Sequence, residues 1–247
     1  MIQFFRKIRQ KLIAKSNFSK YLVYAFGEIA LVMIGILLAL QVNNWNEAQK
    51  SERVRLSYLE FLKSDIESDI KSIDRTMAQN DRFENYGRQL LDFIEGKQPE
   101  LDKLSVARAT KFAVWNPTYA LNKSTYNDLI STGNIALFKD MQLKRLLDNY
   151  YTGNDWGKNF YKRIEQTLWH DFWNERIKYV DGTLLLNEND TTLSDIGNYY
   201  IDIEGIKSSF PFKQNLKIIL GHRKTIRGYQ STDKRRAEEL LKYILEN

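Results

Sequence analysis

An uninterrupted apolar run near the N-terminus constrains this chain more than any other feature. Residues 21–42 read YLVYAFGEIALVMIGILLALQV and contain one charged residue, Glu28. A helix rises about 1.5 Å per residue, so this run reaches about 33 Å, enough to cross a hydrocarbon core of about 30 Å. In lipid, a single segment satisfies its backbone hydrogen bonds only as a helix. The run therefore predicts a transmembrane helix, and a protein whose partners include the lipid bilayer.

Basic residues are concentrated ahead of this run. The first 20 residues hold six of the 37 Lys and Arg and no Asp or Glu, so the rest of the chain is balanced at 31 basic and 31 acidic residues. Because positive flanks stay in the cytoplasm, residues 1–20 are predicted to be cytoplasmic and everything after Val42 extracytoplasmic. A cleavable signal peptide is the alternative, but residues 39–45 make a poor cleavage site. The local origin of the basic excess also argues against a nucleic-acid partner.

Residues 2–15 have an amphipathic pattern, which favours a short helix lying in the membrane interface over a solvated basic tail. Trp45, just after the apolar run, is an aromatic residue of the type found at the opposite interface. The predicted membrane-interface residues are Phe4, Phe5, Arg6, Lys7, Arg9, Lys11 and Trp45.

One face of the predicted span combines an acid with small residues. On a helical wheel this face contains Tyr24, Glu28, Val32, Gly35 and Ala39. Gly35 and Ala39 allow a second helix to approach closely, and an intramembrane carboxylate usually faces a partner. We therefore expect helix–helix packing here, in a homo-oligomer or with a membrane-protein partner. Two alternatives stay open: Glu28 snorkels to the headgroups, or it serves a channel or transport subunit.

The rest of the chain is patterned as helices. Apolar residues recur at steps of three and four from Leu59 to Met77, and no strong breaker precedes Gly96, so the span should continue into a stalk helix over residues 43–96. Residues 97–247 are predicted to form a helical periplasmic domain packing on the stalk. Its expected helices are 101–115, 126–132 (capped by Ser124 or Thr125 and ended by Gly133), 141–180 (opened by Asp140, with Gly153 and Gly157 as candidate division points), 212–230 and 233–246 (capped by Thr232 or Asp233). Residues 181–211 are expected to be irregular. The fold class is all-α, with a helical-bundle extracytoplasmic domain.

No motif points to catalysis. The chain has no Cys and two His, His170 and His222, without a second ligand at metal spacing. Asp65, Glu67 and Asp69 are interpreted as spread around a helix. Aromatic residues are frequent between Trp115 and Trp173; core packing is favoured over a sugar or peptide groove. We expect no enzyme, no cofactor and no metal.

Two segments carry a resemblance. Residues 4–47 include Gly27-Glu28-Ile29, Ile34-Gly35-Ile36 and Asn43-Asn44-Trp45-Asn46, and residues 124–140 read STYNDLISTGNIALFKD. Both resemble an uncharacterised family of Bacteroidota single-pass membrane proteins. The resemblance implies a bacterial inner-membrane protein with a helical periplasmic domain, and it carries no catalytic residues. The sequence thus predicts a membrane-anchored interaction module, a scaffold or sensor, that is oligomeric.

Overall fold

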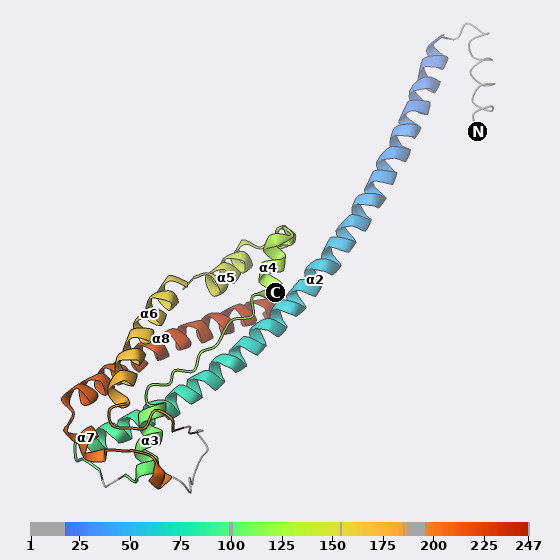
Figure 1. The fold of residues 1–247 in the computed structure, drawn as a ribbon. Helices are drawn as coiled ribbons and strands as arrows, with labels where there is room; N and C mark the ends of the chain where they lie inside the picture. Colours follow the sequence, from blue (N-terminus) through green and yellow to red (C-terminus); the bar gives the residue numbers. More distant parts are fainter. Residues whose placement is uncertain (1–17, 99–100, 154, 185, 187–195, 247) are drawn as a thin grey trace. The chain divides into compact units, whose positions relative to one another are not determined.

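The computed structural model describes residues 18–98, 101–153, 155–184, 186 and 196–246. Over these residues the protein is helical, and the one β feature is an isolated antiparallel bridge between Val180 and Ile201. The helices, drawn in Figure 1, are α2 (Phe18–Ile94), α3 (Lys103–Phe112), α4 (Ser124–Ser131), α5 (Met141–Tyr151), α6 (Asp155–Arg176), α7 (Ile203–Ser208) and α8 (Phe210–Glu246), with 3₁₀ turns η1 (Asn134–Leu137) and η2 (Ile196–Asn198). The all-α prediction is confirmed.

Helix α2 is unbroken from Phe18 to Ile94. Residues 43–46 are helical, as the absence of Pro and paired Gly predicts. Its N-terminal part is long and apolar enough to cross a membrane, with a mean hydropathy of 2.3 over 18 residues, none of them buried within the chain. The helix ends at Ile94, and Gly96, two residues later, has a φ of 70°, the left-handed conformation that glycine adopts most readily.

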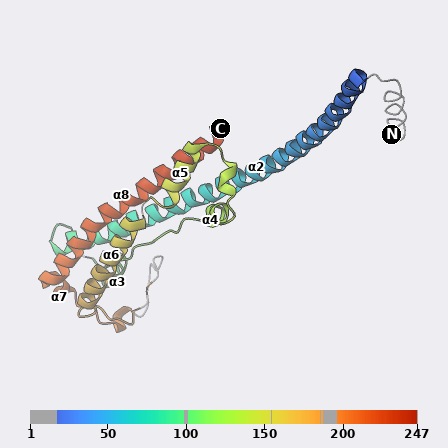
Figure 2. The same ribbon diagram turned by 90° about the horizontal axis from the view of Figure 1, so that it is seen from above.

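The chain divides into two compact units, Met1–Ser57 and Tyr58–Asn247. In the first unit the described residues belong to α2 alone, and its apolar side chains are exposed: Leu31, Ile34, Leu37 and Leu40 each expose more than half of their surface. In the second unit α2 contacts α8, as the Glu95–Lys217 ion pair and the approach of Leu220 to Gly87 show, and α5 and α6 pack along α8 (Figure 1, Figure 2).

Helices α2 and α8 run antiparallel along a seam with heptad spacing. The seam residues on α2 follow alternating steps of four and three: Leu62, Ile66, Asp69, Ile73, Thr76, Asn80, Phe83, Gly87 and Leu90. On α8 the same steps run through Phe212, Leu216, Ile219, Arg223, Ile226, Gln230, Asp233, Ala237 and Leu240. A 3.5-residue repeat keeps one stripe facing a partner helix over many turns. Ion pairs flank the seam: Glu95 with Lys217 (2.7 Å) and Asp74 with Lys234 (2.7 Å).

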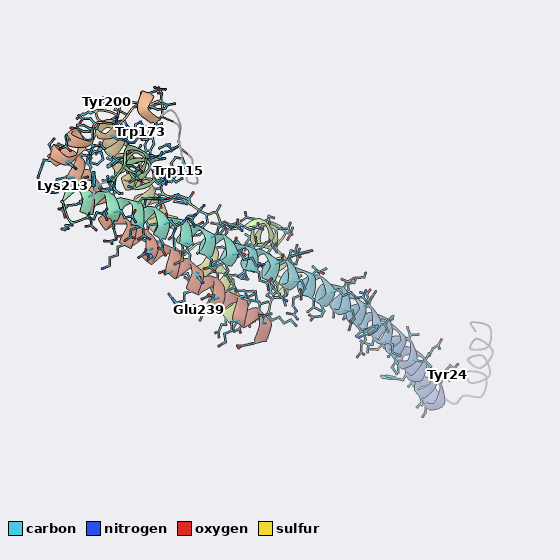
Figure 3. The ribbon with its side chains drawn as sticks, turned by 90° about the horizontal axis from the view of Figure 1, so that it is seen from below. Tyr24, Trp115, Trp173, Tyr200, Lys213 and Glu239 are labelled. Atoms are coloured by element: carbon cyan, nitrogen blue, oxygen red, sulfur yellow. The ribbon has the colours of Figure 1, made fainter. Side chains whose placement is uncertain are left out.

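Two apolar clusters lie at the two ends of this seam. One joins the C-terminal end of α2 to α3, α6, the bridge and the start of α8, around Leu90, Phe172 and Phe212. The other joins Leu62 and Ile66 of α2 to α5 and the end of α8. Figure 3 shows α8 beside α2, with Lys213 and Glu239 labelled near opposite ends of α8.

The prediction of two C-terminal helices is wrong, because α8 is one helix of 37 residues. The expected caps have other roles. The Thr232 hydroxyl donates to the carbonyl of Gly228 (2.8 Å), and the Asp233 carboxylate, 1% exposed, accepts a hydrogen bond from Tyr119 (2.6 Å). Without Gly or Pro at this point, the seam continues through residues 230 and 233.

Other helix boundaries differ by a few residues. The expected helix 141–180 divides at Thr152–Gly153 into α5 and α6, and Asp140 caps α5 by accepting from the amide of Gln142 (2.7 Å). The expected helix 101–115 spans only residues 103–112. Helix α4 begins at Ser124 itself, without a side-chain cap, and Gly133 ends it with φ 74°. Helix α7 lies in the segment expected to be irregular, whose residues 185 and 187–195 are outside the described residues.

Candidate ligand-binding groove

The middle of the α2–α8 seam is polar. Its buried polar residues are Asp69, Thr76 and Asn80 on α2 and Arg223, Gln230 and Asp233 on α8, each less than 9% exposed. Buried polar groups destabilise a protein unless they are hydrogen-bonded. Most of the hydrogen bonds recorded for these six residues lead to one target, the non-helical segment 113–123 that joins α3 to α4.

Arg223 holds the beginning of this segment. Its guanidinium donates to the carbonyl oxygens of Ala113 (2.6 Å) and Trp115 (2.8 Å). Asn80 approaches the carbonyl of Pro117, at 3.5 Å. These bonds satisfy backbone acceptors that neither a helix nor a sheet satisfies, so the segment keeps one conformation although it belongs to no regular element.

Two carboxylates of α2 hold the end of the segment. Asp69 accepts hydrogen bonds from the backbone amide of Asn122 (2.9 Å) and from the hydroxyl of Tyr150 (2.8 Å). Asp65, one helical turn earlier, accepts from the Asn122 side chain (2.7 Å) and from Thr125 (2.5 Å). The interpretation of Asp65 and Asp69 as spread around the helix is therefore wrong for this pair, since residues four apart share a face.

Tyr119 attaches the middle of the segment to α8 through its bond to Asp233. Burial is the largest cause, and the hydrogen bond to Asp233 the second, of a pKa of Tyr119 well above its usual value. The pKa of Tyr150 is raised in the same way, by burial first and by the negative charge of Asp69 second. Both phenols thus stay protonated at neutral pH and act as donors to the buried carboxylates.

A cavity of about 780 Å³ lies between this segment, α6 and α8. Such a volume falls within the range of about 300–1,000 Å³ of small-molecule sites. The segment contributes Asn116, Pro117, Thr118, Tyr119, Ala120, Leu121 and Lys123; α6 contributes Lys162, Gln166, Trp169 and His170; and α8 contributes Ile226, Tyr229 and Gln230. We call this cavity, with these lining residues, the groove.

Two amide oxygens in the groove lining have no hydrogen-bond partner in the part of the chain that the structure describes. The Oε1 atom of Gln230 and the Oδ1 atom of Asn116 are buried and accept no hydrogen bond from the described residues. Gln230 is only 4% exposed, so the cost of leaving its oxygen unsatisfied is about 1–3 kcal/mol. A ligand that brings a hydrogen-bond donor next to this oxygen would remove this cost.

The predicted aromatic region is divided between core and groove. Tyr150, Tyr151 and Phe172 are buried in the apolar clusters, as expected. Trp169, by contrast, is 40% exposed and lines the groove with Tyr119. Trp115 and Trp173, labelled in Figure 3, are outside the lining. A helical stripe pattern did not reveal the groove, because its lining comes from three elements, one of them non-helical.

The two histidines lie apart from any metal-ligand cluster. His170 lines the groove and makes a hydrogen bond with Asn174 (2.9 Å), which is on the same helix. His222 lines a smaller adjoining hollow of about 30 Å³ with Leu168. Among the described residues, no group of three His, Cys, Asp or Glu side chains is arranged to hold a metal ion.

The residues predicted for the membrane lie outside the groove. Tyr24 and Glu28 are half-buried on α2, whereas Val32, Gly35 and Ala39 are exposed, and a Cβ atom added at Gly35 would meet nothing within 4 Å. Trp45 is 65% exposed. The interface residues Phe4, Phe5, Arg6, Lys7, Arg9 and Lys11 lie outside the described residues. The packing role of this face stays a prediction.

Fold and groove together define a class: an all-α protein whose described residues include one helix able to cross a membrane and a helical domain that contains a groove. The chain belongs to the family of unknown function DUF6090, which matches residues 28–196. This match covers residues 28–42 of the apolar run in α2 and the groove residues of the segment and of α6. No curated protein and no solved structure matches the chain.

Proposed function

We propose that this protein is a membrane-anchored binding module whose helical domain takes a ligand in the groove. The observation that carries the proposal is the groove itself: about 780 Å³, with a Gln230 oxygen that is buried and unsatisfied. The polar seam supports it, because several buried polar groups are used to hold one non-helical wall. In this proposal the protein binds its ligand and performs no chemical step.

The membrane arrangement is part of the proposal. The basic N-terminus supports a cytoplasmic segment over residues 1–20, a span over 21–42, and a periplasmic location for the stalk and helical domain. The resemblance of residues 4–47 to Bacteroidota membrane proteins supports the bacterial inner membrane. Because α2 continues from the span into the groove-bearing domain, a ligand-dependent change there has a helical connection to the membrane, as a sensor requires.

Self-association through the span is the third component. The exposed face with Val32, Gly35 and Ala39 supports a homo-oligomer or a membrane-protein partner, since small residues allow close helix approach.

The test of the binding function compares the native protein with a filled groove. Ala120 is exposed and lines the groove, so Ala120→Trp would occupy it without disturbing the seam. Ala78→Trp, at an exposed position of α2 outside the lining, is the matched control. Full-length protein in lipid nanodiscs is screened by ligand-observed NMR against a panel of water-soluble fragments.

We expect a subset of fragments whose signals broaden with the native protein and with Ala78→Trp but not with Ala120→Trp. Equal broadening by all three proteins, or none by any of them, would overturn the proposal.

A further inference from the structure

We infer that the groove selects organic anions that have a flat apolar body and an N–H or O–H donor. This inference rests on the proposed function and specifies its ligand class. Three independent properties of the lining support it: its charge, its aromatic surface and its unsatisfied acceptors.

The charge of the lining is positive. Lys123 projects from the segment and Lys162 from α6, so the two cations come from two different walls. No described residue of the lining is Asp or Glu. The carboxylates that the segment contacts already accept hydrogen bonds from it: Asp65 and Asp69 accept from Asn122, and Asp233 accepts from Tyr119. A carboxylate in the groove would therefore lie near two cationic side chains.

The apolar part of the lining favours a ligand with a flat apolar body. Trp169, Tyr119 and Tyr229 present rings, and Pro117, Leu121 and Ile226 present aliphatic surface. Aromatic side chains bind flat partners by stacking, which a flexible polar ligand does not exploit. Trp169 stacks on Trp173 at a centroid distance of 5.4 Å, and this contact orients its ring.

The donor requirement comes from the two unsatisfied amide oxygens. Gln230 Oε1 and Asn116 Oδ1 are acceptors, and a carboxylate alone has no hydrogen to give them. A site with a buried acceptor discriminates against ligands that lack the matching donor, because the acceptor then stays unpaired. The ligand is thus expected to carry an N–H or O–H group away from its charged end.

Four indole compounds separate these properties. Indole-3-acetate, tryptophol and tryptamine share one ring and one N–H but are anionic, neutral and cationic, and 1-methylindole-3-acetate keeps the charge without the N–H. Their retention by full-length protein in phosphatidylcholine nanodiscs is measured by equilibrium dialysis, with empty nanodiscs as the blank. The variants are Lys162→Gln, Lys123→Gln, Ala120→Trp and, as a control at an exposed lysine outside the lining, Lys224→Gln.

We expect indole-3-acetate to bind about tenfold more tightly than tryptophol or tryptamine, the size of effect typical of one charge-assisted contact. Lys162→Gln and Lys123→Gln should each reduce this preference several-fold and leave tryptophol binding unchanged, whereas Lys224→Gln should change neither. The N-methyl compound should bind several-fold more weakly than indole-3-acetate.

The failures of the two proposals differ. If tryptophol binds the native protein and not Ala120→Trp, but indole-3-acetate binds no better or tryptamine binds best, the groove is a ligand site and the anion preference is wrong. If none of the compounds is retained above the level of Ala120→Trp, both the anion preference and the use of the groove are overturned.

Discussion

Helix α2 contains two regions that differ in what covers their apolar side chains. Over residues 22–42 apolar side chains lie on all sides and are exposed, whereas over residues 62–90 they form one stripe that α8 and its neighbours bury. A helix that is apolar all round requires a lipid or protein environment, and a one-sided stripe requires only a partner on that side. One continuous helix thus contains two patterns, one suited to an apolar surrounding on all sides and one suited to a partner on a single side.

The stripe over residues 62–90 is apolar at its ends and polar in its middle. The polar middle connects the packed region to the groove. Leu62 and Leu90, at the ends of the stripe, are apolar, while Asp69 and Asn80, in the middle, are polar and bind the segment that forms a groove wall. An apolar middle would pack two helices equally well but would leave the carbonyls of that segment without donors. The polar residues are therefore explained by the wall they hold and not by the stability of the helix pair.

The largest expected effect on stability comes from replacing leucine with alanine in the packed region, and the same replacement in the apolar run is its control. Leu62→Ala removes a fully buried side chain and should destabilise the helical domain by about 2–5 kcal/mol. Leu38→Ala removes a side chain that is 58% exposed within the chain and should leave the unfolding of that domain unchanged. Thermal unfolding of the full-length protein in detergent, followed by circular dichroism, measures both. Equal losses would contradict the distinction between the regions.

Two adjacent tyrosines test the polar part of the seam. Tyr150→Phe deletes a donor to the buried Asp69 carboxylate and should cost about 1–3 kcal/mol. Tyr151 is equally buried, but its hydroxyl has no hydrogen-bond partner among the described residues. Tyr151→Phe should therefore be neutral or slightly stabilising in the same unfolding measurement. A larger loss for Tyr151→Phe than for Tyr150→Phe would show that these hydroxyls do not stabilise the seam.

Substitutions at two glycines of α2, Gly35 and Gly87, distinguish the predicted helix-packing face of the span from the buried seam. Gly35→Leu should reduce the oligomer mass in mild detergent, because overpacking of a close helix contact costs about 1–3 kcal/mol. It should leave the unfolding temperature of the helical domain unchanged. Gly87→Leu should lower the unfolding temperature of the helical domain and leave the oligomer mass unchanged. A Cβ atom at residue 87 would already lie 2.8 Å from Leu220. Normal assembly of Gly35→Leu would refute packing on this face.

The carboxylate on the same face should contribute less. Interhelical hydrogen bonds in membranes average about 0.6 kcal/mol, so Glu28→Gln should weaken assembly less than Gly35→Leu does. Sedimentation of the two variants at several protein concentrations measures how strongly each substitution weakens assembly. A stronger effect of Glu28→Gln than of Gly35→Leu would show that the carboxylate contributes more to this contact than the small residue does.

The smallest effect concerns a partly exposed ion pair at the end of the packed region, between Lys217 and Glu95. Hydrogen bonds from Lys217, and then from Lys97, lower the pKa of Glu95 from 4.5 to about 2. A lowered pKa means that the charged form stabilises the folded state above pH 4.5, and that this contribution disappears as the pH falls from 4.5 towards 2. Glu95→Gln should therefore lower the unfolding temperature slightly at pH 7 and not at pH 2. A difference that is independent of pH would contradict the ion pair.

The span pattern, the helical class and several helix ends could be predicted from the sequence, because they depend on local chemistry. Gly96 and Gly133 adopt the left-handed conformation expected at helix ends, and Asp140 caps α5. Asp233 shows where local reasoning fails: it has the chemistry of a cap, but in the fold its carboxylate accepts the hydroxyl of Tyr119, 114 residues away in the chain.

The groove depended on tertiary structure alone. Its lining comes from segments between Asn116 and Gln230 that have no common spacing, and its non-helical wall is held by Asp65, Asp69 and Arg223, which sequence patterns place only on helices. A hydrophobic period reports which face of a helix is buried, since burial follows the repeat of the helix itself. It does not report which distant backbone a buried polar side chain will bind, because that depends on how the helices pack against one another.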